Sequence, residues 1–516
     1  MKFRQTLAAL TAALLLLCAL AGCSQPAAAP STSPAADAPA VSSQPQQEPQ
    51  DSAKPLKYVF LFIGDGMSYP QFQAAADYLG AVADPAPDIL KGGRNLSFME
   101  VPVAGSASTF DSTSFAPDSA STATSIATGY KTHSGVINMD ETKTKAYETI
   151  AEKLKNQLGY KIGIISTVNL NHATPAAFYA HQASRNSYYE ISEELIASGF
   201  DYFAGGGLKQ TTGADKDKTD SYELARQGGY KVVMTQAEAE ALTAADGKAI
   251  IIGQTLADSD SLSYDNDRSG DEWALSDYVR KGIEVLDNDT GFFMMVEGGK
   301  IDWACHANDA GSTIADTIAM ADAVDVAMEF YAQHPDETLI LVTGDHETGG
   351  LTIGYAGTDY DTYLQNIANQ KLSYARYDTD FVAKYKEENT PFETVLQDVK
   401  ANFGLMTKDD PDASENSKLV LTDYEYGLLK AAYDKTMSAS DADPTQAEYV
   451  LYGSYEPLSV TITHLLNNKS GINFASYAHT GLPVAVFAQG NGQELFKGFY
   501  DNTEIYTKMA QLLDVK

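Results

Sequence analysis

Cysteine and positive charge are both scarce in this chain of 516 residues. Cysteine occurs at only three positions, Cys18, Cys23 and Cys305. Three cysteines are too few to hold a chain of this length as a disulfide scaffold. Lys and Arg number 36 against 69 Asp and Glu, which gives a formal net charge of −33. Because nucleic-acid binding depends on Lys and Arg that neutralise phosphates, this balance argues against nucleic acid or any other polyanion as a partner.

The apolar run at the N-terminus, residues 7–20, is shorter than the about 20 residues of a bilayer-spanning helix. It follows two basic residues and ends in LAGC, which closes on Cys23. This order of features predicts an export signal over residues 1–22. The segment LAGC at residues 20–23 looks like a bacterial lipobox, so we expect an exported protein anchored on the cell membrane through a lipidated Cys23. An ordinary cleaved signal with an incidental cysteine is the alternative.

Residues 23–55 consist mainly of Ala, Pro, Ser and Gln. Such a segment cannot bury enough apolar surface to fold, so we expect a flexible tether. The chain as a whole is 44% hydrophobic and 20% charged, which is a globular composition. We therefore assign residues 56–516 to one folded domain, in which Cys305 is the sole thiol and no internal disulfide can form.

Short runs that are apolar at nearly every position recur along this domain. Such runs predict strands covered on both faces, as in an α/β fold with a central, mostly parallel sheet flanked by helices. They are Tyr58–Ile63, Lys161–Ser166, Ala249–Ile252, Phe292–Val296, Leu339–Thr343 and Val484–Ala488. Apolar residues at helical spacing over 314–328 predict an amphipathic helix between two of them.

Strand signals fade from about residue 355 to 451, and helix starts replace them. The segments that begin at Thr390 and Thr422 have the pattern of capping boxes, the first with Pro391 at the first helical position. The pattern predicts a largely helical insertion over 355–451, carried by the α/β core. The sequence leaves the role of this insertion open among a lid, an interface and a rim that selects substrates.

Carboxylates and histidines follow the ends of several predicted strands. In open α/β sheets, ligands bind at the carboxyl edge of the strands. Asp302 and His306 are four residues apart, so a helix would place both on one face. The full set is Asp65, Glu297, Asp302, His306, Asp345, His346 and His479. Taken singly, such pairs are more typical of hydrogen-bonded surface groups, but together they supply ligands for zinc and oxygen sites for Mg²⁺.

Ser119 is the candidate nucleophile. It opens a predicted helix that ends near Gly129, so it would lie where backbone N–H groups and the helix dipole favour an anion. On local sequence alone, a plain N-cap role for Asp118 or Ser119 is the simpler interpretation.

A second helix is predicted in HATPAAFYAHQASR, with Thr174 as N-cap and Pro175 at the first helical position. Arg185 lies at the far end of this segment. Its planar guanidinium group can bind two phosphoryl oxygens at once.

Together these residues resemble the alkaline phosphatase family. Five blocks occur in the family's order, with AHTG as a sixth: IGDGM, PDSASTAT, HATPAAFYAHQASR, EGGKIDWACH and TGDHETGG. The resemblance covers the chain from about Lys57 to its end, apart from the insertion. It implies hydrolysis of phosphate monoesters through a phosphoserine intermediate on Ser119. It leaves the physiological substrate and the oligomeric state open, although members are frequently homodimers.

The resemblance also implies two zinc ions and one magnesium ion. One zinc ion would be held by Asp302, His306 and His479. The second, close to Ser119, would be held by Asp65, Asp345 and His346. The magnesium ion would be held by Asp65, Thr174 and Glu297. Arg185 would bind the substrate phosphate, oriented by Asp118.

His172 and Trp303 depart from the enteric periplasmic enzymes, which carry Asp and Lys at these positions. Other bacterial and animal members show the pair in part or whole. The resemblance places both residues beside the third ion. An imidazole there in place of a carboxylate would weaken Mg²⁺ binding, so the identity of the third ion stays open.

Two other function classes compete with this interpretation. Phosphodiesterases and sulfatases share the fold and the metal-binding edge, but diesterases commonly lack the arginine, and Ser119 lacks the Cys/Ser-x-Pro-x-Arg setting of sulfatases. A non-enzymatic lipoprotein that binds metal or phosphate for a transporter would lack the nucleophile or Arg185, and the sequence has both.

Overall fold

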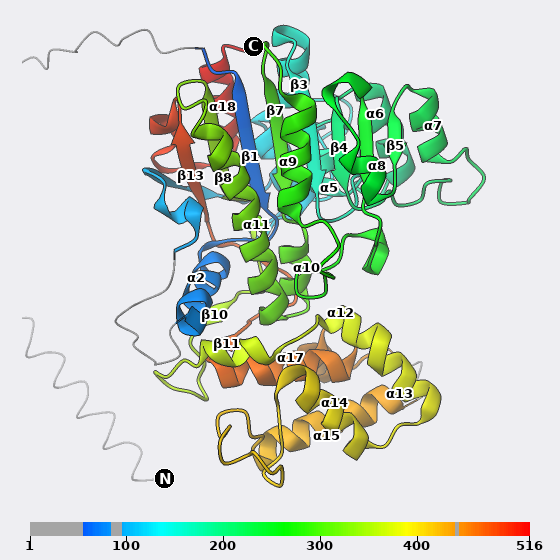
Figure 1. Ribbon diagram of the computed structural model, residues 1–516, viewed down its shortest axis with the longest axis vertical. Coiled ribbons are helices and arrows are strands. Elements are labelled where there is room, and N and C mark those ends of the chain that lie inside the picture. The colour runs from blue at the N-terminus through cyan, green and yellow to red at the C-terminus, as the bar shows by residue number, and fades with distance from the viewer. Residues whose placement is uncertain (1–54, 84–94, 439–442) are drawn as a thin grey trace, which may run out of the picture. The chain divides into compact units, whose positions relative to one another are not determined.

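A ten-stranded sheet organises the part of the chain that the computed structural model describes, which comprises residues 55–83, 95–438 and 443–516. The strand order is β14-β2-β13-β8-β1-β7-β3-β4-β6-β5, and within this sheet β13 alone runs antiparallel to its neighbours (Figure 1). The strands are β1 (Tyr58–Gly64), β2 (Val103–Ser108), β3 (Lys161–Ser166), β4 (Tyr202–Gly205), β5 (Lys231–Val233), β6 (Ala249–Ile252), β7 (Phe292–Glu297), β8 (Thr338–Gly344), β13 (Val484–Gly490) and β14 (Gly498–Asp501). The predicted central, mostly parallel sheet is confirmed.

All six predicted strands are present in this sheet, as β1, β3, β6, β7, β8 and β13, and the other four strands of the sheet were not predicted. Two of the four, β4 and β5, are short, with four and three residues. Strand β2 has the sequence VAGSAS and buries mainly every second residue. Short or alternating small-residue segments carry no continuous apolar run, so the sequence gives no signal for them.

Side chains of β1 alternate between two cores. Those at even positions pack in one core with α9 (Leu275–Leu286) and α11 (Ala310–Tyr331). Those at odd positions pack in the other with α3 (Ser119–Thr128) and α18 (Thr503–Leu513). Figure 1 shows α9 and α11 in front of the strands. This burial on both faces explains why the strand sequences are apolar throughout.

The remaining helices of the α/β part are short or lie at its borders. They are α2 (Tyr69–Ala83), α4 (Ile150–Lys153), α5 (Ala173–Ala176), α6 (Tyr188–Ser198), α7 (Ser221–Gln227), α8 (Gln236–Glu240) and α10 (Lys300–His306).

The carboxyl ends of β1, β7 and β8 meet at one edge of the sheet. Gly64 pairs with Gly344, and Ile63 pairs with Glu297. The residues that follow β1 and β8 therefore come out next to each other and next to Glu297. Because β13 is antiparallel, it begins at this edge, and the segment before it arrives there as well.

Helices follow one another between β10 (Thr352–Ile353) and β11 (Ile472–Asn473), which pair with each other. The described residues of this region contain no strand. The helices are α12 (Tyr374–Tyr377), α13 (Ala383–Glu388), α14 (Phe392–Phe403), α15 (Asp423–Met437), α16 (Gln446–Tyr452) and α17 (Pro457–Ser470). The boundary predicted at residue 451 falls inside α16, and helical structure continues to Ser470.

One of the two predicted capping boxes is confirmed. The Thr422 hydroxyl accepts the Glu425 N–H, and the Glu425 carboxylate accepts the Thr422 N–H. The box predicted at Thr390 is wrong, because Pro391 is itself the N-cap and α14 begins at Phe392 with no side-chain cap. The extended backbone of Pro391 delays the helix by one residue, so Thr390 lies too far from the first turn.

Residues 1–22 and all of the predicted tether but Pro55 lie outside the described residues. Among the helices that the structure does describe, none has the length and apolar character needed to cross a membrane.

Gly344 allows β8 to end tightly against the turn that follows β1. A Cβ atom at position 344 would lie 1.9 Å from the backbone oxygen of Met67. We expect Gly344→Ala to lower the free energy of unfolding by about 1–3 kcal/mol, because the backbone must shift to relieve this overlap. Urea denaturation measures the change.

Gly427→Ala is the matched control. Gly427 lies inside α15, and a Cβ there meets nothing within 4 Å. Helix propensity alone predicts a gain of up to about 1 kcal/mol for this variant. Equal unfolding free energies for Gly344→Ala and the wild type would contradict the close approach of the two segments.

Candidate active site

Ser119 is the first residue of α3, and Asp118 is its N-cap. The Asp118 side chain accepts the N–H of Ser121, and the helix ends at Gly129, whose φ is 78°. The Ser119 side chain is buried, and its hydroxyl oxygen lies 3.1 Å from His346 Nε2 and 3.4 Å from Asp65 Oδ1. Asp118 thus provides the cap, and the Ser119 hydroxyl is left to face the cluster of carboxylates and histidines.

Asp65, Asp345 and His346 converge on this hydroxyl. His346 Nε2 lies 3.3 Å from Asp65 Oδ1 and 3.3 Å from Asp345 Oδ2. Metal–ligand distances of about 2.0–2.1 Å place tetrahedral donor atoms about 3.4 Å apart. These separations suit donor atoms that share one tetrahedral ion, and the Ser119 hydroxyl lies at similar distances from His346 and Asp65. We call this group of three residues the serine-side site.

Asp302, His306 and His479 form a second group, the outer site. Asp302 and His306 come from α10, and His479 comes from β12 (His479–Thr480). Asp302 Oδ1 lies 3.4 Å from His306 Nε2 and 3.6 Å from His479 Nε2. The two imidazole nitrogens are 3.1 Å apart. These separations also suit tetrahedral coordination.

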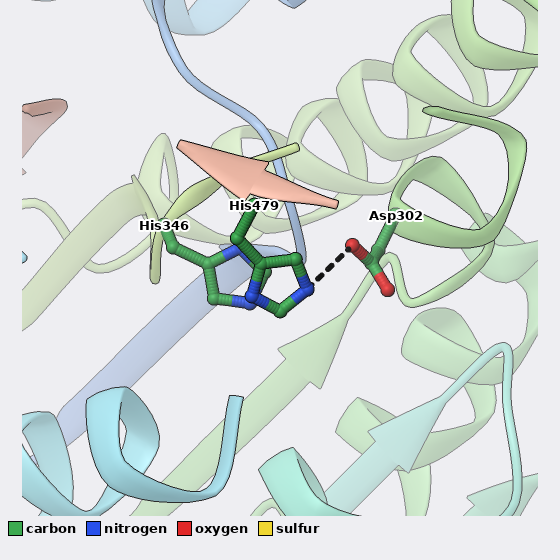
Figure 2. A group of neighbouring side chains, drawn as sticks. All are labelled: Asp302, His346 and His479. Atoms are coloured by element: carbon green, nitrogen blue, oxygen red, sulfur yellow. Dashed lines mark ion pairs between the residues drawn. The ribbon is translucent and has the colours of Figure 1, made fainter. Parts of the chain in front are cut away.

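The two sites adjoin each other through His346. Its ring stacks on that of His479 with a centroid separation of 3.7 Å. Figure 2 shows the two rings side by side and Asp302 facing His479. Asp302, His346 and His479 also bring donor atoms close enough together to hold an ion. His346 therefore lies at the boundary between the two sites.

A hydrogen bond of the Nδ1 atom orients each of the three imidazole rings, those of His306, His346 and His479. The Nδ1 atoms of His306 and His479 lie 2.7 and 2.5 Å from backbone carbonyl oxygens, and that of His346 lies 3.2 Å from the hydroxyl of Thr348. A carbonyl oxygen only accepts, so the proton of those rings is on Nδ1 and the Nε2 lone pair faces the cluster. The rings are thus in the tautomer that binds a metal.

A third group forms behind Asp65. Asp65 Oδ2 lies 3.2 Å from the Thr174 hydroxyl oxygen, and Glu297 lies beside them with one carboxylate oxygen bonded to Ser166. The other Glu297 oxygen is buried and has no hydrogen-bond partner among the described residues. A cation bound here would satisfy that oxygen.

The helix that carries Thr174 starts earlier than predicted. His172 is the N-cap of α5, which begins at Ala173, so the predicted N-cap role of Thr174 and the first-position role of Pro175 are wrong. The extended backbone of His172 sets the start. Thr174 falls within the first turn, where its hydroxyl faces Asp65.

His172 joins this third group to Arg185. Its Nε2 lies 3.2 Å from Arg185 Nη2, and burial lowers its pKa to about 3, so the ring is neutral. Because a guanidinium only donates, Nε2 accepts and the proton lies on Nδ1, which is buried and without a partner in the described residues. His172 therefore carries a buried N–H without a described partner and belongs to the third group with Asp65 and Glu297. Trp303 packs edge-on against its ring, with a centroid separation of 5.9 Å.

Arg185 is held in place by Asp118. Its Nη1 lies 2.8 Å from Asp118 Oδ2, and its backbone N–H donates to Gly135. Burial by itself would raise the pKa of Asp118, but the Arg185 charge and the N–H of Gly135 lower it. The pair is therefore ionised, and the guanidinium is fixed near Ser119.

Burial makes the carboxylates of this edge unfavourable as anions. It raises the pKa of Asp345 to about 8 and that of Glu297 to about 7, and it raises the pKa of Asp65 well above its ordinary range. Neighbouring carboxylates add to the shifts of Asp65 and Asp345. Divalent cations are the charges that offset such a cluster.

Thr348 is a residue of this site that the sequence reasoning missed. It lies in β9 (Glu347–Thr348), two residues after His346. Its hydroxyl donates to Asp302 Oδ1 at 2.6 Å and accepts from His346 Nδ1 at 3.2 Å. One hydroxyl thus orients a carboxylate of the outer site and an imidazole of the serine-side site. The spacing of two residues after His346 is the signal that extended backbone would place both on one side.

Replacing Thr348 by valine removes this hydroxyl at nearly constant shape. With added zinc as the probe, we expect Thr348→Val to weaken metal binding by about 10–100-fold, the typical effect of losing a group that orients metal ligands. Both sites should be affected, since Asp302 and His346 each lose a partner. Competition between the metal-free protein and a chromogenic chelator measures both dissociation constants.

Thr348→Ser keeps the hydroxyl and should restore most of the affinity. Thr352→Val is the control for loss of a hydroxyl nearby, because the exposed Thr352 side chain bonds only to backbone oxygens. Wild-type zinc affinity at both sites of Thr348→Val would disprove this role.

Comparison with known proteins identifies the family. The alkaline phosphatase family model matches residues 56–515. Alkaline phosphatase 4 of Bacillus subtilis is 30% identical over 465 residues, which cover 88% of each chain. The repressible alkaline phosphatase of Saccharomyces cerevisiae is 25% identical over 501 residues, covering 89% of this chain and 81% of the yeast protein.

Solved structures of alkaline phosphatases are also similar to this chain. A cold-active alkaline phosphatase from Shewanella sp. superposes with a TM-score of 0.71 at 28% identity, covering 88% of this chain and 99% of that chain. The Thermus thermophilus alkaline phosphatase, at 23% identity, shows the fold alone, with a TM-score of 0.72 over 90% of this chain and 93% of that chain. With its family model matched over nearly the whole described chain, this protein belongs to the alkaline phosphatase family and is a phosphatase.

Proposed function

We propose that the protein hydrolyses phosphate monoesters to an alcohol and inorganic phosphate through a phosphoserine on Ser119, with two zinc ions and one magnesium ion. The observation that carries the proposal is the position of the Ser119 hydroxyl. It lies at the N-terminus of α3 and within 3.1 to 3.4 Å of His346 and Asp65. A buried hydroxyl in this setting is typical of a nucleophile activated by a metal.

The donor sets support the choice of ions. Imidazole and carboxylate together suit zinc, and an all-oxygen set suits magnesium. Zinc would be held at the outer site by Asp302, His306 and His479, and at the serine-side site by Asp65, Asp345 and His346. Magnesium would be held by Asp65, Thr174 and Glu297. When bound, the ions supply Lewis acidity that lowers the pKa of hydroxyl groups and offsets negative charge.

Arg185 supports a monoester as the substrate. Asp118 holds Nη1 and His172 contacts Nη2, so the guanidinium is fixed from two sides. Its other N–H groups are left to bind phosphoryl oxygens, two of which a guanidinium can bind at once. A monoester offers three such oxygens and a diester only two, so the monoester makes better use of this group.

The reaction follows in two displacements. The Ser119 oxygen attacks phosphorus, the bond to the ester oxygen breaks, and the alcohol leaves with a proton. Water then attacks the phosphoserine, which releases inorganic phosphate and restores the hydroxyl. The backbone N–H groups at the start of α3 and the Arg185 guanidinium stabilise the negative charge on the phosphoryl oxygens in both steps.

We also propose that the protein is exported and anchored to the membrane surface through a lipidated Cys23. The support is the order of basic residues, apolar run and LAGC at the N-terminus. Export would place the enzyme where it acts on small phosphate esters outside the cytoplasm.

Ser119→Ala separates binding from chemistry. We expect it to retain its metal ions, because the carboxylates and histidines are unchanged, and to lose at least about a thousandfold in kcat on an aryl phosphate monoester. After incubation with radiolabelled phosphate and an acid quench, the wild type should carry covalent label and Ser119→Ala none.

Ser125→Ala is the control on the same helix, since the buried Ser125 hydroxyl donates only to the backbone oxygen of Ser121. It should label and turn over like the wild type. Acid-stable label on Ser119→Ala would disprove the assignment of the nucleophile.

A further inference from the structure

Lys209 lies at the same edge of the sheet as the proposed ion sites. It belongs to the segment that follows β4, and this segment runs beside the one that leads into α5. The Leu170 N–H donates to the Gly207 oxygen at 3.1 Å. The Lys209 N–H donates to Asn171 Oδ1 at 2.9 Å. Lys209 is therefore held next to the residue that precedes His172.

The buried Asn171 amide fixes this arrangement. Its Nδ2 lies 2.9 and 3.1 Å from the backbone oxygens of Lys209 and Tyr188 and 3.0 Å from the Ser192 hydroxyl oxygen, so three acceptors share its two hydrogens. One side chain thus joins the start of α5, the start of α6 and the loop after β4. The backbones of Lys209 and Tyr188 cannot drift relative to the site without breaking buried hydrogen bonds.

The ammonium group of Lys209 has no carboxylate partner among the described residues. It lies over the ring of Tyr188, 5.0 Å from the centroid. Lys218 shows the contrast, because its ammonium lies 4.3 Å from the Tyr189 centroid and also pairs with Glu190 at 3.0 Å. No described carboxylate therefore neutralises the charge of Lys209, although the chain has a net charge of −33.

The Lys209 ammonium is close enough to His172 to act on it electrostatically. After burial and Arg185, it is one of the charges that lower the pKa of His172, whose ring contacts Arg185 at 3.2 Å. Tyr188 in turn is close enough to act on Arg185 electrostatically. The contacts agree with this: Lys209 bonds to Asn171, the residue before His172, and His172 contacts Arg185.

We propose that Lys209, supported by the Tyr188 ring, binds a second anionic group of the substrate. The inference rests on the proposed function and names its substrate class: phosphate monoesters whose alcohol part carries another phosphate or a carboxylate. Arg185 binds the phosphoryl group that is transferred, and Lys209 binds the group that is not. A lysine ammonium is a point charge on a flexible stem, so it can bind either kind of anion.

A series of α,ω-alkanediol bisphosphates, compared with alkyl monophosphates of the same chain length, tests the proposal. The quantity measured is the ratio of kcat/KM for the bisphosphate to that for the monophosphate. We expect the wild-type ratio to exceed the statistical factor for two equivalent phosphates and to peak at one spacer length. High salt should reduce it, because an exposed ion pair is screened.

Lys209→Met should lower this ratio by about fivefold at the best spacer length, the upper effect of a solvent-accessible ion pair. Lys209→Arg should keep the preference, since it keeps the charge. Lys218→Met is the matched control, because it removes the same charge from a lysine that lies over the neighbouring tyrosine but is already paired. Its ratio should equal that of the wild type.

Two results would overturn the proposal. An unchanged ratio in Lys209→Met would show that the lysine does not contact the second anion. An equal fall of kcat/KM on both substrates would show that its charge acts on the transferred phosphate alone. A wild-type enzyme that cleaves neither series would contradict the proposed function itself, and the inference with it.

Discussion

Buried carboxylates that must share one edge of a parallel sheet are the constraint on which this structure depends. Asp65, Glu297, Asp302 and Asp345 are all shielded from water, and three of them have raised pKa values in the absence of cations. Such a cluster is stable as anions only when positive charge lies among them. The three proposed ion sites, the tautomers of the histidines and the placement of Ser119 are all consistent with this requirement.

Asp65 is central because its two oxygens face different groups. Oδ1 lies near His346 and the Ser119 hydroxyl, and Oδ2 lies near Thr174. The register of β1 with β7 and β8 puts this carboxylate between its two neighbouring strands. The formal charge of −33 therefore describes the chain as a whole, whereas the site depends on how a few buried carboxylates are compensated.

The sequence predicted the parts of the structure whose signals are local. Six strands were predicted because burial on both faces makes them apolar throughout, and the candidate ligands at those strand ends could be named from their motifs. Weak local signals failed. Strands β2, β4, β5 and β14 are short or carry no long apolar run. The start of α5 lies two residues before the predicted one, and that of α14 lies one residue after it. The backbone conformations of His172 and Pro391 decide those starts.

Thr348 and Lys209 show why other residues of the site could not be predicted from the sequence. The contact of the Thr348 hydroxyl with Asp302 joins residues 46 positions apart, and Lys209 is fixed through an asparagine 38 positions before it. The spacing of two residues relates Thr348 to His346 but not to Asp302, and a single lysine on a loop has no periodicity. Their roles appear only when β9, α10 and the loop after β4 are brought to the same edge.

Anomalous diffraction from crystals of the metal-loaded protein, recorded on both sides of the zinc absorption edge, tests the central claim most directly. Two zinc peaks are predicted. One should be bounded by Asp302, His306 and His479, and the other by Asp65, Asp345 and His346 within coordination distance of the Ser119 hydroxyl. Zinc at other residues, with these donor atoms left unligated, would contradict the account.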